Sequence, residues 1–305
     1  MKKIIKVLSL LLIPIGAFGQ LVPVTSQYIL NPLTINPAFA GNRGALNLSA
    51  FFRKQWVGIP GAPETTSFIA DAPIMDNKVG VGFSLISDRI GVTKETQFVT
   101  NYAYRLNLGK GILSLGLGAG ITTTNTAWSD LIVIDPGDEA YLVDSRLFVI
   151  PNFSFGVYYK SGRQFGGFSI PRFLSYNFSS DKNKYSVQVD PNQYSYMLMY
   201  GYLFDISEKV NFIPSTLITL SPGGKFLMDL NGYFTFNDRF WVGVSYKTSQ
   251  SFAGLFQFQI NNQLRIAYTY DYDFGKLGSY SNGSHEIMLR YEFRYKVDVP
   301  SPLIF

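Results

Sequence analysis

The chain has 305 residues, of which 47% are apolar, 16% are aromatic and only 15% are charged, and it has no cysteine. This composition excludes an intrinsically disordered chain, a collagen-like repeat and a scaffold built on disulfides or cysteine-ligated zinc. The formal net charge is +5, but three lysines fall in a predicted removable leader, which leaves 23 basic against 21 acidic residues. We therefore expect no nucleic-acid partner.

Residues 1–19 have the layout of a secretory signal peptide. A basic start is followed by an apolar run from Val7 to Phe18 and by a small-x-small ending, which predicts cleavage before Gln20. The apolar run is shorter than the ~20 residues of a spanning helix, so a cleaved leader is favoured over an uncleaved anchor. We expect an exported protein that burial and hydrogen bonding stabilise without disulfides.

The segment 20–44 precedes the first predicted strand. It contains three prolines and little alternation, so it is neither a strand nor a membrane span. Its apolar residues, such as Tyr28 and Phe39, favour an arm packed on the rest of the protein over a disordered tail.

Alternation of large apolar with small or polar residues dominates residues 45–294, and it puts one set on each face of a strand. Most of these segments have about the 9 to 11 residues with which a tilted strand crosses a bilayer. The predicted strands are Leu46 to Trp56, Thr65 to Ile74, Val79 to Asp88, Thr96 to Leu106, Ile112 to Thr124, Asn152 to Lys160, Gln164 to Ile170, Tyr194 to Phe204, Val210 to Leu220, Lys225 to Phe236, Phe240 to Thr248, Phe252 to Ile260, Leu264 to Tyr272 and Glu286 to Arg294.

The connections between these strands differ in length according to whether they follow an even-numbered or an odd-numbered strand. Those after even-numbered strands have three to five residues, whereas those after odd-numbered strands have up to 27. Bacterial outer-membrane barrels combine short periplasmic turns with longer outer loops, and a closed ring leaves no unpaired edge in lipid. We predict an all-β fold, a transmembrane antiparallel β-barrel of about 14 strands with an N-terminal arm or plug. A soluble antiparallel sandwich or barrel is the alternative, but its aromatic stripes would face water.

This fold predicts four parts: a signal peptide (1–19), an arm or plug (20–44), an outer-membrane barrel (45–294) and a C-terminal tail (295–305). The apolar strand faces would contact outer-membrane lipid, and both mature termini would be periplasmic. The alternating glycines from Gly116 to Gly120 lie inside a strand and not between a strand and a helix, so they form no phosphate-binding loop. We expect them to leave room for something packed against the inner wall.

Residues that could carry catalysis are few. His285 is the single histidine, so multi-histidine metal sites are excluded, and a Ser-His-acid triad would have to use His285 with neighbours such as Ser281, Ser284 or Glu286. No nucleophile-elbow pattern accompanies them, and His285 is expected to order the last hairpin. The carboxylates of Asp135 to Glu139 lack the ligand spacing of a calcium loop. We predict a non-enzymatic protein without cofactor or metal.

The last predicted hairpin offers a register to test. Pairing Tyr272 with His285 puts Arg265 opposite Glu292 on the inner face, and opposite charges help to fix such a register. The same register sets Asp271 opposite Glu286, a like-charged pair that would need a counter-ion or a basic group of a partner.

Several short motifs resemble those of one known family. They are Ser26 to Pro32, Asn36 to Gly41, Arg53 to Gly58 with Gly61 to Pro63, Asp88 to Gly91, and Tyr270 to Phe274 with Gly283 to Tyr291. In this order, and over nearly the whole mature chain, they resemble the PorP/SprF family of type IX secretion system outer-membrane proteins.

The resemblance implies a non-enzymatic barrel of the secretion and gliding machinery of Gram-negative bacteria. It implies periplasmic type IX machinery components as partners, together with a secreted cell-surface adhesin or its C-terminal domain. A small-solute pore or a transporter for apolar compounds is the alternative. Candidate partner-contact or plug residues are Gln27, Tyr28, Asn31, Asn36, Pro37 and Gly41 in the arm, Arg53, Trp56 and Gly61 around the first outer loop, and His285 and Glu286 in the last hairpin.

Overall fold

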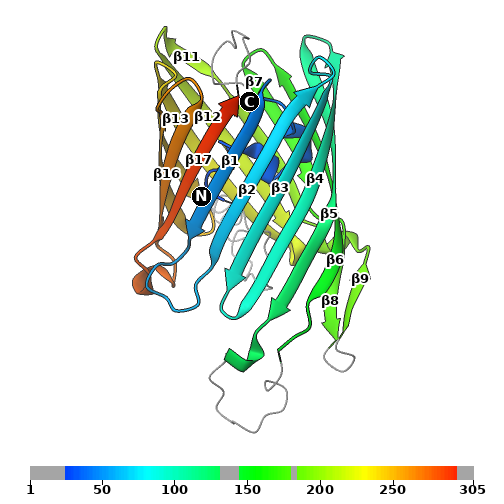
Figure 1. Cartoon of the computed structure of the whole chain (residues 1–305). Coiled ribbons are helices and arrows are strands. Elements are labelled where there is room, and N and C mark those ends of the chain that lie inside the picture. Colours follow the sequence, from blue (N-terminus) through cyan, green and yellow to red (C-terminus); the bar gives the residue numbers. More distant parts are fainter. Residues whose placement is uncertain (1–24, 131–143, 180–183, 294–305) are drawn as a thin grey trace, which may run out of the picture.

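The computed structural model describes residues 25–130, 144–179 and 184–293. Fourteen antiparallel strands form a ring that closes where β1 pairs with β17 (Figure 1), so the predicted barrel is confirmed. The strands of the ring are β1 (Leu46–Lys54), β2 (Glu64–Ile74), β3 (Val79–Ile90), β4 (Thr93–Leu108), β5 (Gly111–Thr126), β6 (Phe148–Ser161), β7 (Gln164–Ile170), β10 (Tyr196–Tyr202), β12 (Val210–Ser221), β13 (Lys225–Phe236), β14 (Phe240–Lys247), β15 (Ser251–Gln259), β16 (Leu264–Asp273) and β17 (Ser284–Phe293).

Three short strands lie outside the ring. β11 (Phe204–Ser207) pairs with β12 beside the ring, and β8 (Ser175–Ser179) pairs with β9 (Lys184–Gln188) in a separate hairpin. Among the described residues no helix is long and apolar enough to cross a membrane. The helical segments are short 3-10 turns: η2 (Pro32–Thr34), η3 (Pro37–Phe39), η4 (Trp128–Asp130), η6 (Pro191–Gln193), η7 (Pro222–Gly224) and η8 (Gly278–Tyr280).

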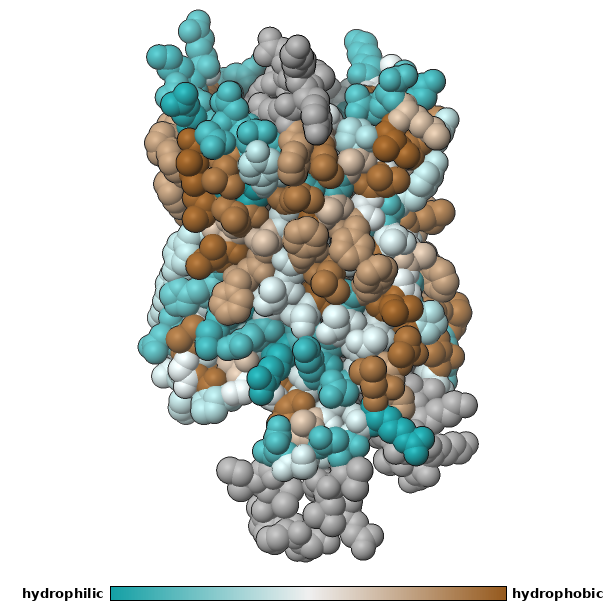
Figure 2. All heavy atoms as spheres, in the orientation of Figure 1, coloured by the Kyte–Doolittle hydropathy of each residue, from teal (hydrophilic) through white to brown (hydrophobic). Residues whose placement is uncertain are grey.

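The two faces of the wall differ as alternation predicts. On β15 the Phe252 side chain is 53% exposed on the outside, whereas Gln257 is 1% exposed on the inside. Figure 2 shows hydrophobic side chains gathered on the outer wall, with hydrophilic ones at the rim drawn uppermost. Such an apolar outer band is the surface that a barrel presents to lipid.

Short and long connections also lie at opposite ends of the barrel. Tight turns such as Gly109-Lys110 lie at the end drawn uppermost in Figure 1. The β1–β2 and β16–β17 loops, and the strand ends of β5 and β6 that a long connection joins, lie at the other end. One predicted loop is wrong: β3 and β4 are joined by only Gly91 and Val92, where seven residues were expected, because their hydrophilic ends continue the ladder up to the pair Ile90 and Thr93.

Pro214 lies within β12, opposite Gly232 of β13. It lies just beyond the last β10–β12 pair, Gly201 with Ser215, where the neighbour of β12 changes to β11. A proline is tolerated where a ladder ends because its missing N–H then breaks no bond.

The predicted register of the last hairpin is wrong by two residues. The observed pairs include Tyr270 with His285, Arg265 with Arg290, Ala267 with Met288 and Asp271 with Ser284. A shift of two leaves every side chain on the face that alternation assigns to it, so the sequence pattern cannot distinguish the two registers.

The arm enters the barrel. Residues 25–44 lie within the ring, and most of their side chains are buried, including Gln27, Tyr28 and Ile29 at 0–1% exposure. We call residues 25–44 the plug. The predicted leader, the start of the arm at 20–24, the Asp135 to Glu139 cluster and the tail at 295–305 lie outside the described residues.

Candidate functional site: a plug held by buried charges

Two proline turns fold the plug into a compact body. Pro32 begins η2 and Pro37 begins η3, the first helical position at which a proline loses no hydrogen bond. Asn36 caps η3, since its Oδ1 accepts a hydrogen bond from the Ala38 backbone N–H at 2.9 Å. The turns keep the backbone short enough to fold within the barrel.

Glycines of the wall let the plug backbone approach closely. A Cβ atom would lie 1.8 Å from Ala40 O at Gly80, 2.1 Å from Ala38 N at Gly116 and 1.9 Å from Asn36 Oδ1 at Gly156. The expectation that inner-wall glycines leave room for a packed segment is therefore confirmed at Gly116. It is wrong at Gly118 and Gly120, where the nearest atoms belong to the Ser154 side chain and the Phe98 backbone of neighbouring strands.

The part of the plug around Ile35 and Asn36 is hydrogen-bonded to the wall. Asn36 Nδ2 donates to the carbonyl oxygens of Val157 at 3.0 Å and Phe168 at 3.3 Å. Ser169 Oγ donates to Ile35 O at 2.7 Å. These bonds join the start of η3 to β6 and β7 and hold this part of the plug in place.

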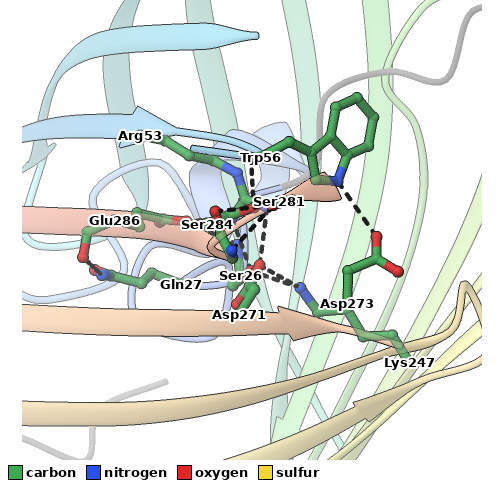
Figure 3. A network of polar contacts seen from close by, with 11 residues as sticks. Ser26, Gln27, Arg53, Trp56, Lys247, Asp271, Asp273, Ser281, Ser284 and Glu286 are labelled. Atoms are coloured by element: carbon green, nitrogen blue, oxygen red, sulfur yellow. Dashed lines mark hydrogen bonds and ion pairs between the residues drawn. The ribbon is translucent and has the colours of Figure 1, made fainter. Parts of the chain in front are cut away.

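A group of buried charges holds the plug at Ser26 (Figure 3). Its members stand at the strand ends that lead into the connections on the long-loop side of the barrel. Arg53 donates to Glu286 Oε2 at 2.7 Å, to Asp271 Oδ2 at 2.9 Å and to Ser26 Oγ at 2.8 Å. Lys247 Nζ donates to Ser26 Oγ at 2.5 Å and to Asp271 Oδ2 at 3.2 Å. We call Ser26, Arg53, Lys247, Asp271 and Glu286 the outer ionic cluster.

This cluster joins the plug to four strands and balances its own charge. The Ser26 backbone N–H donates to Glu286 Oε2 at 3.0 Å, and the Ser26 hydroxyl donates to Asp271 Oδ2 at 2.5 Å. Two carboxylates therefore face two cations. The basic groups that the pair of Asp271 and Glu286 was predicted to need are supplied by this chain, as Arg53 and Lys247. Buried carboxylates without such partners would cost several kcal/mol each.

A second group of charges lies in the half with the short turns. The Gly41 backbone N–H and Asn47 Nδ2 donate to Asp71 at 2.9 and 2.7 Å. Arg43 and Arg290 both donate to the Leu30 carbonyl oxygen. Arg43 and Arg265 lie 3.7 and 3.8 Å from Glu292, so this group ties the plug to β1, β2, β16 and β17.

The predicted plug residues all lie in the lumen. Gln27 Nε2 donates to the Glu286 carbonyl oxygen at 3.1 Å, and the Tyr28 hydroxyl accepts from Asn231 Nδ2 at 2.5 Å. Asn31 is buried, and Pro37 packs against Gly116. Gly41 has φ +64 and a Cβ there would lie 2.5 Å from Ala72 O, so this position requires glycine.

The candidates of the first outer loop lie around its base and tip. The Trp56 backbone N–H donates to Ser284 Oγ at 3.1 Å, and Trp56 Nε1 donates to Asp273 Oδ2 at 3.3 Å (Figure 3). Gly61 adopts φ +72, and its carbonyl accepts from the Gly91 N–H at 2.8 Å. This loop is thus joined to the β16–β17 hairpin and to the β3–β4 turn.

His285 lies apart from the other candidates. It is on the outer face of β17, where its Nδ1 lies 2.6 Å from the Tyr268 hydroxyl, while Ser284 and Glu286 face the lumen. His285 therefore forms no Ser-His-acid triad with them. The described ranges contain no group of three or more histidines and carboxylates that could hold a metal ion.

Sequence reasoning named Gln27, Arg53 and Glu286 as candidates in three separate segments. The structure brings them together, with partners that the sequence analysis missed. Ser26 and Lys247 of the outer ionic cluster, and Asp71 and Arg290 near the short turns, were not candidates. A signal was present, since each of the three charged residues stands at an inward position of an alternating strand. Charges are costly on the lipid face of a barrel, so inward charges indicate contacts within the lumen.

A closed 14-strand ring with an apolar outer band, short turns at one end and a folded segment in its lumen defines an outer-membrane β-barrel. The family model for the type IX secretion system membrane protein PorP/SprF matches residues 17–291, and the chain belongs to this family.

A solved structure agrees with the fold. The CymD monoaromatic hydrocarbon channel is 12% identical with a TM-score of 0.53, and the match covers 92% of this chain and 96% of that one. Omp33, an outer membrane protein of Acinetobacter baumannii, is 7% identical with a TM-score of 0.49 and covers 82% of this chain and 100% of its own. No curated protein matches the chain. At such identities the CymD likeness bears on the fold alone.

Proposed function

We propose that this protein is a non-enzymatic scaffold of the type IX secretion and gliding machinery, which supports the secretion or surface anchoring of a partner such as a large adhesin. Membership of the PorP/SprF family supports the link to the machinery. The observation that carries the scaffold role is the plug, because a lumen filled by residues 25–44 leaves the wall ends and loops as the working surfaces.

The orientation follows from the loops. Outer-membrane barrels keep short turns in the periplasm and long loops outside. In this proposal the short turns, such as Asn237 to Arg239, contact the periplasmic components, and the long loops contact the adhesin or its C-terminal domain. In this orientation the end of β17 at Phe293 lies on the periplasmic side, and the described chain begins at Thr25 inside the lumen. The periplasmic location of both mature termini stays a prediction.

A transport role is the less favoured function. A diffusion pore needs a continuous aqueous path, and the plug bonds to opposite sides of the wall through Ser26, Asn36 and Tyr28. Conductance in planar bilayers separates the two roles: the intact protein should be silent as a scaffold, and steady openings would favour transport.

A gene deletion tests the scaffold role in cells. Deletion should abolish surface display of the adhesin, measured by antibody binding or by its digestion with external protease, while small-solute permeability stays normal. Complementation with the wild-type gene should restore display.

A complementing variant in which Gly275 to Asn282 is replaced by a two-residue turn should insert but fail to restore display, because it lacks the long loop between β16 and β17. The matched control replaces the short turn of residues Asn261 to Gln263, at the other end of β16, by a two-residue turn in the same way. Unchanged adhesin display in the deletion strain would remove the proposal.

A further inference from the structure

A cavity of about 350 Å³ lies inside the barrel on the long-loop side of the plug. Its wall includes the ends of β1, β16 and β17 together with inward residues of β10, β12 and β13. The volume is within the ~300–1,000 Å³ typical of ligand pockets. We call this space the outer cavity.

The outer cavity has more carboxylates than cations. Arg53 and Lys247 line it, but both already pair with Asp271, and Arg53 also pairs with Glu286. Three more carboxylates line the same space, those of Asp88, Asp229 and Asp273. Among the described residues none of these three has an ion-pair partner within 4.0 Å.

Asp229 stands out among the three. Lys247 is its direct neighbour across the β13–β14 ladder, yet the Lys247 ammonium is directed to Ser26 and Asp271. Asp88 accepts a hydrogen bond from Thr65, and Asp273 accepts from Trp56 and from the Gly275 N–H. Asp229 has no such bond within the described part of the chain and is only partly exposed.

Two other polar groups in the cavity wall lack partners. Asp271 Oδ1 and Ser221 Oγ are buried, and no described group is hydrogen-bonded to either atom. Both side chains are more than nine-tenths buried and both line the outer cavity. Buried polar atoms of this kind are ordinarily satisfied, so they indicate a place for a polar ligand or for the water around it.

The wall beside Asp229 is apolar. Leu217 is directly opposite Asp229 in the β12–β13 ladder, and Leu227 and Met197 also line the cavity. A carboxylate at the edge of an aliphatic surface matches a ligand with a cationic head and an apolar stem.

We propose that the outer cavity binds a primary ammonium on an aliphatic stem, with the ammonium at Asp229 and the stem along Leu217, Leu227 and Met197. This inference rests on the proposed function: the ligand is a lysine side chain that the secreted partner inserts from outside. A free organic amine has the same chemistry and is the other source.

Calorimetry on the purified full chain in detergent at low salt tests the chemistry without any partner. The probes are n-butylammonium, N-acetyl-lysinamide, n-butanol and butyrate. Both ammonium compounds should bind saturably, whereas the neutral and anionic compounds should not. Binding of n-butylammonium without N-acetyl-lysinamide would assign the site to a free amine.

The variant Asp229→Asn should weaken ammonium binding about ten- to hundred-fold, because the neutral amide removes the charge with which the ammonium pairs. Asp229→Glu should retain most of it. Asp76→Asn, the same change in a short turn at the opposite rim, should have no effect. Heat-modifiable migration on gels confirms that each variant is a folded barrel.

The proposal is overturned if neither amine binds, if n-butanol binds as well as n-butylammonium, or if Asp229→Asn leaves the affinity unchanged. These results are independent of adhesin display in cells, so failure of the cavity and failure of the scaffold role are distinguishable.

Discussion

Replacing Arg53 by methionine should release the outer end of the plug. The side chain is 9% exposed and makes three hydrogen bonds, and its removal leaves Asp271 and Glu286 facing each other with only Lys247 as a counter-ion. Breaking a buried pair by removing one partner costs about 3–5 kcal/mol. At about 1.4 kcal/mol per factor of ten, the opening equilibrium of the plug should rise by at least about a hundred-fold.

Hydrogen exchange measured by mass spectrometry on the detergent-solubilised protein reads this opening directly. Peptides that cover residues 25–31 should lose protection in Arg53→Met, while peptides from β3 to β5 should keep it. The neighbour on the same strand is a matched control: Lys54 pairs with Glu64 at 2.8 Å, but both side chains are more than 40% exposed. Lys54→Met should therefore change stability by less than about 1 kcal/mol.

A second variant separates lost attraction from lost packing. Adding Glu286→Gln to Arg53→Met removes one uncompensated carboxylate, so part of the protection should return. If Arg53→Met exchanged no faster than Lys54→Met, the outer ionic cluster would not be what anchors the plug.

Three further outcomes follow from the same geometry. Gly116→Ala should lower the hydrogen-exchange protection of residues 36–40, because overpacking against Ala38 costs about 1–3 kcal/mol. Gly254→Ala should leave this protection unchanged, since nothing lies within 4 Å of its added Cβ. Equal protection in both variants would contradict the close approach of Ala38. Deleting residues 25–40 should convert a silent barrel into one with steady openings in planar bilayers, and continued silence would show that another segment closes the lumen. Because the chain has no cysteine, Ser279→Cys should react with an impermeant maleimide on intact cells and Asn262→Cys only after the outer membrane is permeabilised, and the reverse pattern would invert the proposed orientation.

The repeating part of this protein could be read from its sequence. A period of two needs only neighbouring residues to reveal it, so all fourteen strands of the ring and their inner and outer faces were predicted. Loop lengths are equally local, and they indicated which end of the barrel carries the long connections. The prolines and apolar residues of the arm indicated a packed segment for the same reason.

What the sequence left open depends on contacts between distant residues. The last hairpin was predicted two residues out of register because side-chain faces repeat every two residues, and the choice between registers is made where the whole ring closes. The β8–β9 hairpin lies between the predicted strands that end at Ile170 and begin at Tyr194, where no strand was predicted.

The site itself shows the same division. Arg53 and Glu286 were candidates from their motifs, but no sequence spacing relates Ser26 to Lys247 or either of them to Asp271, and both Lys247 and Asp271 are more than 200 residues from Ser26. They meet because closing the ring turns every inward side chain toward one shared space. Alternation alone determined which residues face inward, and only the tertiary structure decided which charges meet there, since a charge buried in the lumen is stable only where opposite charges or hydrogen-bond partners reach it.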